Sequence, residues 1–119
     1  MRKKSVLKEK SKRFGLRVIG LYKYLCNEKK EFVLSKQVLR SGTSIGANIS
    51  ESTYAQSKAD FVAKVSIALK EAAETEYWLE LLHESKYLED SFFESIHDDC
   101  VELIKMLTSS VKTSKDNEN

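Results

Sequence analysis

The absence of proline is the feature that most limits what this chain can fold into. Proline lacks a backbone N–H and clashes with the preceding helical turn, so it interrupts helices, and none of the 119 residues is proline. Apolar residues recur at three- and four-residue spacing over about residues 5–28, 35–54, 58–84 and 90–112. The sequence therefore predicts four long helices.

Short polar stretches separate the four predicted helices, and short connections between long helices favour antiparallel neighbours. We therefore predict an all-α fold, an antiparallel up-down-up-down four-helix bundle, in a single domain over residues 1–119. Its ordered core is expected over about residues 5–112, with flexible residues at the N-terminus and a flexible tail over residues 113–119.

The glycines lie inside the first two predicted helices, at Gly15, Gly20, Gly42 and Gly46. Glycine in a helix interior costs up to about 1 kcal/mol relative to alanine. We therefore expect a neighbouring helix to approach closely at Gly15 and Gly20. The four-residue spacing of Gly42 and Gly46 predicts close packing within a soluble bundle, because this helix is too polar for a membrane.

Neither a membrane nor an oxidising compartment is indicated. No apolar run reaches the roughly 20 residues that a membrane-spanning helix needs, and no apolar secretory core follows the basic N-terminus. We expect a cytoplasmic protein. Cys26 and Cys100 are predicted at levels about 9 Å apart along the bundle, beyond the reach of a disulfide, so both are expected to be reduced.

Charge is distributed unevenly along the chain. Residues 1–17 carry eight lysines and arginines against one glutamate, whereas residues 70–101 carry two lysines against ten acidic residues. In the predicted bundle these segments give a basic end and an acidic end. The basic end is a candidate surface for nucleic acid phosphates, and its residues are Arg2, Lys3, Lys4, Lys8, Lys12 and Arg13. The alternative is that the acidic helices neutralise this charge within the molecule.

Two Glu-x-x-His motifs are the strongest enzyme-like signal. Glu80 and His83 belong to the third predicted helix, and Glu94 and His97 to the fourth. In a hairpin of these helices, Glu80 lies level with His97 and His83 with Glu94. Paired motifs of this kind hold two metal ions in carboxylate bundles, together with one glutamate from each of the other helices. The second helix has no acidic residue at this level, so solvated helix ends are the alternative.

Other catalytic motifs are lacking. The sequence has no glycine-rich phosphate loop, no hydrolase elbow and no Cys-x-x-Cys pair. We therefore expect neither enzymatic activity nor a cofactor.

Polar residues form one stripe on the second predicted helix. In a hairpin with the third helix, Arg40 faces Glu74, and we predict an ion pair between them. Buried ion pairs add little net stability but fix the register of neighbouring elements. The predicted structural network comprises Arg40, Ser44, Asn48, Glu51, Lys70, Glu71 and Glu74.

The third predicted helix is apolar on more than one face. One stripe of apolar residues suits the bundle seam, and two further stripes end at Trp78 and Leu82. Such a helix has more apolar surface than one core needs, which is typical of a subunit interface. We predict that Trp78 and Leu82 belong to this interface.

Residues of the polar stripe and of the third predicted helix match the motif of a known protein family. The matching positions are Arg40, Ser44, Ile45, Asn48 and Glu51, then Ser57, Asp60 and Phe61, and then the run IALKEAAETEYWL over residues 67–79. This pattern resembles the bacterial four-helix bundle proteins encoded in intervening sequences of 23S rRNA genes, also called the S23 ribosomal protein family. The resemblance extends from the first helix to the middle of the fourth. Gly46 and Ser52 depart from it, because many relatives have proline and glycine there.

This resemblance implies an up-down four-helix bundle, a ring-like homopentamer and no established catalytic activity. The related accessory variability determinant of diversity-generating retroelements is a basic pentamer that binds nucleic acid and a reverse transcriptase. RNA, DNA or a nucleic-acid enzyme is therefore an implied partner. We expect a non-enzymatic homo-oligomeric scaffold or adaptor without a cofactor, and the alternative is the di-metal carboxylate protein described above.

Overall fold

The computed structural model describes residues 2–116, with side chains over residues 6–116, and this part of the chain contains four helices and no strand. The helices are α1 (Arg2–Asn27), α2 (Leu34–Ser52), α3 (Lys58–Glu84) and α4 (Asp90–Asp116). The prediction of an all-helical fold with four helices is confirmed. No helix in this range is long and apolar enough to cross a membrane.

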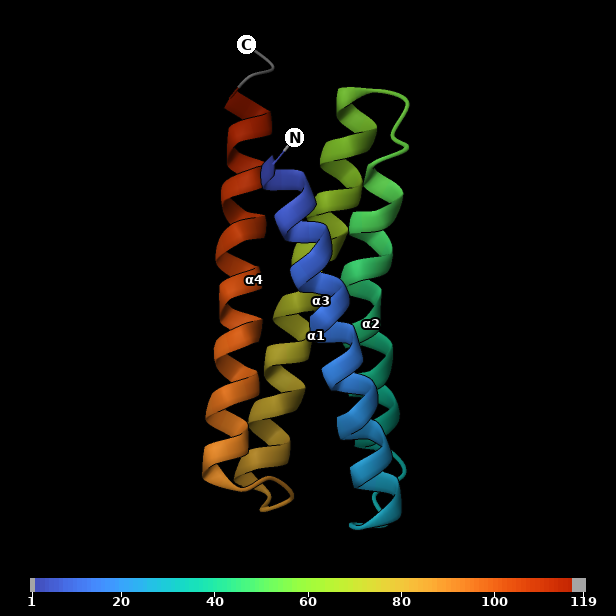
Figure 1. The fold of residues 1–119 in the computed structure, drawn as a ribbon, viewed down its shortest axis with the longest axis vertical. Helices are drawn as coiled ribbons and strands as arrows, with labels where there is room; N and C mark the ends of the chain where they lie inside the picture. Colours follow the sequence, from blue (N-terminus) through green and yellow to red (C-terminus); the bar gives the residue numbers. More distant parts are fainter. Residues whose placement is uncertain (1, 117–119) are drawn as a thin grey trace.

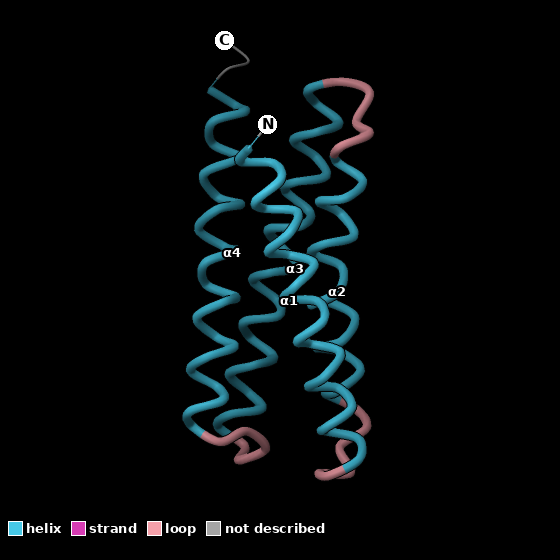
Figure 2. The backbone as a smooth tube through the Cα atoms, in the orientation of Figure 1, coloured by secondary structure: helices cyan, strands magenta, loops and turns pink. Residues whose placement is uncertain are grey.

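Consecutive helices run in opposite directions along one long axis, and the connections lie at alternate ends (Figure 1). The described part of the chain measures 49 × 21 × 21 Å along its principal axes. Figure 2 shows the loops confined to the two ends of the molecule. The start of α1 and the end of α4 therefore lie at the same end, together with the α2–α3 connection.

The helix boundaries follow from local capping. The Ser57 hydroxyl accepts a hydrogen bond from the Asp60 amide at 3.0 Å, and the Asp60 carboxylate accepts one from the Gln56 amide at 3.2 Å. The first of these bonds satisfies an amide that the start of α3 leaves without a helical partner, and the second ties the preceding residue to the helix. The last helix, α4, continues to Asp116, because no glycine or proline follows residue 112 to end it earlier. The flexible tail was predicted over residues 113–119, but residues 113–116 form the last turn of α4. Residues 117–119 lie outside the described part.

The core runs the length of the molecule and takes side chains from all four helices. Its fully buried large members are Phe14, Val18, Leu25, Val38, Ile45, Ile49, Val65, Leu79, Leu82, Ile96, Leu103 and Leu107. The prediction of an interface role for Leu82 is wrong, because the core of its own chain buries its side chain completely. Trp78 is only partly buried beside this core.

Two glycines allow α1 and α2 to pack closely. A Cβ atom at Gly42 would lie 2.8 Å from both Cγ atoms of Val18, and one at Gly46 would lie 3.4 Å from the Ser11 carbonyl oxygen. The close packing predicted for this pair is confirmed. The prediction for Gly15 and Gly20 is wrong, because a Cβ at either position would meet nothing within 4 Å.

The seam between α1 and α4 is the weakest of the four. These helices contact each other far less than consecutive helices do. Ion pairs bridge them, with 3.2 Å between Lys10 Nζ and Glu102 Oε2 and 2.7 Å between Arg17 Nη1 and Asp99 Oδ2. The Arg17 guanidinium also lies over the Phe92 ring, 5.6 Å from its centroid. Solvent screens such exposed pairs, so they hold this seam weakly.

Candidate functional site

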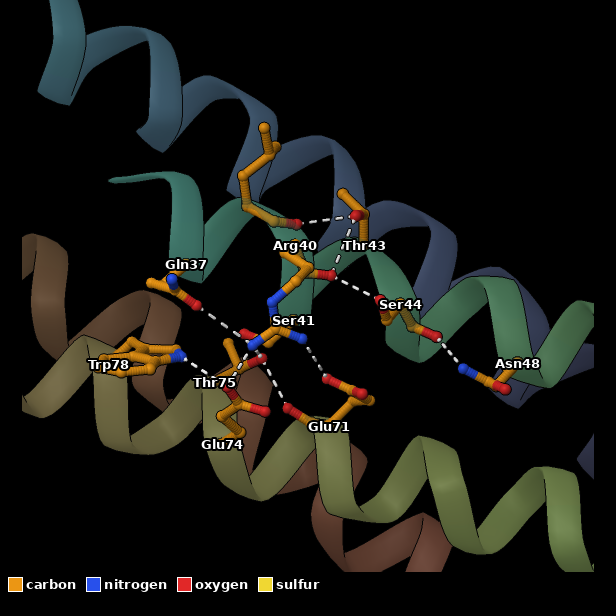
Figure 3. Close-up of polar contacts among 11 residues, drawn as sticks. Gln37, Arg40, Ser41, Thr43, Ser44, Asn48, Glu71, Glu74, Thr75 and Trp78 are labelled. Carbon is orange, nitrogen blue, oxygen red and sulfur yellow. Dashed lines mark hydrogen bonds and ion pairs between the residues drawn. The ribbon is translucent and has the colours of Figure 1, made fainter. Parts of the chain in front are cut away.

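A polar cluster around Arg40 joins α2 to α3 (Figure 3). Arg40 Nη2 forms an ion pair with Glu74, and Nη1 lies 3.4 Å from Glu71 Oε1. Gln37 Oε1 accepts a further hydrogen bond from Arg40 at 3.4 Å, and Trp78 Nε1 donates one to Glu74 at 3.2 Å. The predicted Arg40–Glu74 pair is therefore present, and Glu71 belongs to the same cluster.

The rest of the predicted network does not join Arg40 through side chains. The Ser44 hydroxyl donates to the Arg40 carbonyl at 2.6 Å, and the Asn48 amide donates to the Ser44 carbonyl at 2.9 Å, so both bond to their own helix. Glu51 pairs with Lys64 at 2.9 Å and raises the pKa of that lysine. Lys70 is exposed and has no partner among the described residues.

Two buried hydroxyls lie beneath the Arg40 cluster. Ser41 Oγ and Thr75 Oγ1 are 2.8 Å apart, and Thr75 Oγ1 is 2.7 Å from the Glu71 carbonyl oxygen. Each hydroxyl has one proton, so Thr75 donates to the carbonyl and Ser41 donates to Thr75. We did not predict this pair. Its sequence signal is a polar residue at a core position on each of two facing helices.

The Arg40 cluster fixes the register of two helices. Half of the Arg40 side chain remains exposed, so solvent screens its ion pairs and they add little stability. Together with the buried hydroxyl pair, they penalise any shift of α2 along α3, because a shift leaves buried polar groups without partners. The side chains of Glu71, Glu74 and Gln37 each accept a hydrogen bond from the Arg40 guanidinium, which favours a structural role.

The described basic side chains near the start of α1 do not form one patch. Lys8 and Lys12 are exposed along a groove of about 400 Å³ between α1 and α2. Arg13 lies 3.5 Å from Glu9 and borders a different depression, toward Asp99 on α4. Arg2, Lys3 and Lys4 also belong to the predicted surface, but their side chains lie outside the described part of the chain.

The exposed apolar side chains of the bundle include some on α1 and some on α3. On α1, Leu16 is 61% exposed and lines the α1–α2 groove together with Ile19. On α3, Tyr77 is 54% exposed, and its ring centroid lies 5.4 Å from that of Trp78. Ile67 is exposed on the same helix. These exposed residues of α1 and of α3 form two surfaces that no other helix in the described part of the chain covers.

The two Glu-x-x-His motifs do not assemble as predicted. His83 Nε2 lies 2.7 Å from Asp90 Oδ1, and Glu94 is exposed on α4. His97 Nε2 instead lies 2.9 Å from Glu76 Oε2 on α3. The predicted four-residue metal site is therefore wrong, because facing helices give two residues the same level without pointing both side chains toward the same seam.

Both cysteines are free thiols, as predicted. Cys100 is buried in the core and its thiol donates a hydrogen bond to the Ala72 carbonyl at 3.4 Å. Burial, reinforced by the charges of Glu76, Asp99 and Glu80, raises the pKa of the Cys100 thiol to about 12. The thiol is thus protonated at neutral pH and unsuited to nucleophilic chemistry.

The fold places this chain among small proteins built of four long helices, with polar clusters between them that set their register. Within that class the chain belongs to the 23S rRNA-intervening sequence protein family, whose model matches residues 3–109. The family resemblance in the sequence is thereby confirmed.

A solved structure supports the same assignment. The crystal structure of a protein with unknown function from the S23 ribosomal protein family of Bacteroides thetaiotaomicron shares 58% sequence identity with this chain. The two structures superpose with a TM-score of 0.91 over 92% of this chain and 98% of that one. No curated protein matches the chain.

Proposed function

We propose that this chain is a non-enzymatic scaffold, built on an antiparallel up-down-up-down bundle, that assembles into a homopentamer and binds nucleic acid in the cytoplasm. The observation that carries the proposal is the α1–α2 groove. It places Lys8 and Lys12, which have no acidic partner in the described part of the chain, next to the exposed Leu16 and Ile19.

The two uncovered apolar surfaces support assembly. A ring requires each copy to offer two different surfaces, because a single self-complementary surface closes as a dimer. The surface at Leu16 and Ile19 on α1 and the surface at Tyr77 and Trp78 on α3 meet this requirement. The ring of five comes from the family resemblance. The interface proposed on α3 contains Trp78, as the sequence predicted, and Tyr77, but it does not contain the buried Leu82.

The distribution of paired and unpaired lysines supports nucleic acid binding. Glu102 and Asp99 on α4 neutralise Lys10 and Arg17, whereas Lys8 and Lys12 point along the other side of α1. A ring that repeats this pair around one rim presents a multivalent surface to phosphates. The acidic residues of α4 then neutralise only the basic residues on the α1–α4 side of α1, and they leave Lys8 and Lys12 unneutralised.

Assembly is tested by light scattering on a sizing column. We expect a mass of about five times the 13.6 kDa chain mass, and we expect Leu16→Asp or Tyr77→Asp each to reduce the mass, because each change places a charge on one of the two surfaces. A wild-type chain that is monomeric at every concentration contradicts the pentamer.

Nucleic acid binding is tested by titrating labelled single-stranded RNA and duplex DNA at several salt concentrations. Lys8→Gln with Lys12→Gln should lower the affinity and reduce the slope of log K against log salt by about 1.4–1.8, since each phosphate contact contributes about 0.7–0.9. The matched control is Lys29→Gln with Lys36→Gln, which removes the same charge at the opposite end and should bind as the wild type does. The pentamer should survive both double changes, and no wild-type binding even at low salt contradicts this part of the proposal.

A further inference from the structure

Three potential metal ligands converge on the seam between α3 and α4. Glu76 and Glu80 lie one helical turn apart on α3, and His97 faces them from α4. One carboxylate oxygen of each glutamate and one imidazole nitrogen lie within 4.8 Å of one another. All three side chains are partly buried. Glutamates four residues apart share one helix face, so the backbone itself sets this convergence.

The histidine is held in place from two sides. His97 Nε2 lies 2.9 Å from Glu76 Oε2, and the ring stacks against Phe93 with 4.9 Å between ring centroids. Phe93 also stacks against His83, with 4.1 Å between ring centroids. A histidine whose ring is oriented by packing gives up less side-chain entropy when it binds a ligand.

The second glutamate is not satisfied within the chain. The Glu80 carboxylate is partly buried and forms no hydrogen bond or ion pair among residues 6–116. No lysine or arginine in that range pairs with Glu76 or Glu80. The surrounding segment adds negative charge, because residues 70–101 carry ten acidic residues against two lysines. Two neighbouring carboxylates surrounded by further negative charge are stabilised by a bound cation.

We propose that Glu76, Glu80 and His97 bind one divalent transition metal ion, with Zn²⁺ as the best fit. Two carboxylate oxygens and one imidazole nitrogen form a donor set that zinc accepts, with water in the remaining position. Magnesium is a poorer fit, because it prefers oxygen donors alone and keeps most of its waters. Zinc bonds of about 2.0–2.2 Å separate tetrahedral donor atoms by about 3.4 Å, so small side-chain rotations bring the three donors into position.

This site differs from the two-metal arrangement considered from the sequence. It uses Glu80 and His97 of the paired motifs, takes Glu76 as a third ligand, and leaves His83 with Asp90 and Glu94 in solvent. Because its ligands come from two helices, the ion links α3 to α4 near the acidic end. A bound ion therefore stabilises the folded chain by mass action.

The test is calorimetric titration of the chelator-treated full chain with Zn²⁺. We expect one zinc ion per chain and a higher melting temperature in its presence. Glu80→Gln and His97→Gln should each weaken zinc binding by more than about 100-fold, beyond the 10–100-fold typical of losing an outer partner of a ligand. Circular dichroism of the metal-free variants establishes that they are folded.

Matched controls come from the same two motifs. Glu94→Gln and His83→Gln remove one carboxylate and one imidazole close to the site, and both should bind zinc as the wild type does. Excess Mg²⁺ should not displace the zinc. The proposal is overturned if the wild type gives no binding heat, if either control variant loses affinity as strongly as Glu80→Gln, or if Mg²⁺ displaces the zinc.

Discussion

Phe14→Ala is expected to lower the free energy of unfolding by about 3–5 kcal/mol, the range found when a buried phenylalanine is truncated in a packed core. Phe14 is only 2% exposed and is among the largest fully buried side chains. It also borders the α1–α4 seam, next to Asp99, Glu102 and Leu103. Urea denaturation followed by circular dichroism measures the change.

The control for this variant is Phe32→Ala. Phe32 has the same side chain but is 53% exposed in the α1–α2 connection, so its loss should change the unfolding free energy by no more than about 0.5 kcal/mol. Equal destabilisation by the two substitutions would contradict the packing described for α1.

Gly42→Val is expected to destabilise the fold by about 3 kcal/mol, at the upper end of the range for overpacked cores. The added Cβ alone would lie 2.8 Å from both Cγ atoms of Val18, and Val18 is completely buried, so it has no free space into which to move. Two further methyl groups worsen the clash, and relieving it requires α1 and α2 to separate. Thermal unfolding measures the loss.

Gly20→Ala is the matched control in the neighbouring helix. A Cβ at Gly20 meets nothing within 4 Å, and alanine favours a helix over glycine by about 1 kcal/mol. This variant should therefore be more stable than the wild type. A loss of stability at Gly20 would mean that another molecule covers that face of α1.

The helices were predictable because their spacing signal extends over many turns and no proline interrupts it. The same regularity set the level at which α2 and α3 meet, which is why the Arg40–Glu74 pair was found from the sequence. The position of a side chain depends, however, on two coordinates, its level along the helix axis and its direction around that axis. The direction in which a side chain points around the helix axis changes by 100° per residue.

That second coordinate explains what the sequence did not reveal. Glu80 and His97 were correctly placed at one level, but Glu94 points into solvent and Glu76 supplies the carboxylate nearest His97. Leu82 was assigned to an outer surface because α3 has apolar residues on several faces, and periodicity alone does not show which face meets the core. On α1, Lys8 and Lys12 likewise point toward the α1–α2 groove, whereas Arg13 points toward α4.

From the weakness of the α1–α4 seam we expect it to be the last part of the bundle to form. The α1–α2, α2–α3 and α3–α4 hairpins each form between segments that are close in the chain, whereas the fourth seam joins the two ends and closes the longest loop. Its screened ion pairs contribute little until the hairpins are in place. The seam therefore closes after the rate-limiting step, so Phe14→Ala should accelerate unfolding while leaving the folding rate nearly unchanged, a φ value near 0 in stopped-flow kinetics. A φ value near 1 would instead place the docking of α1 against α4 in the folding nucleus.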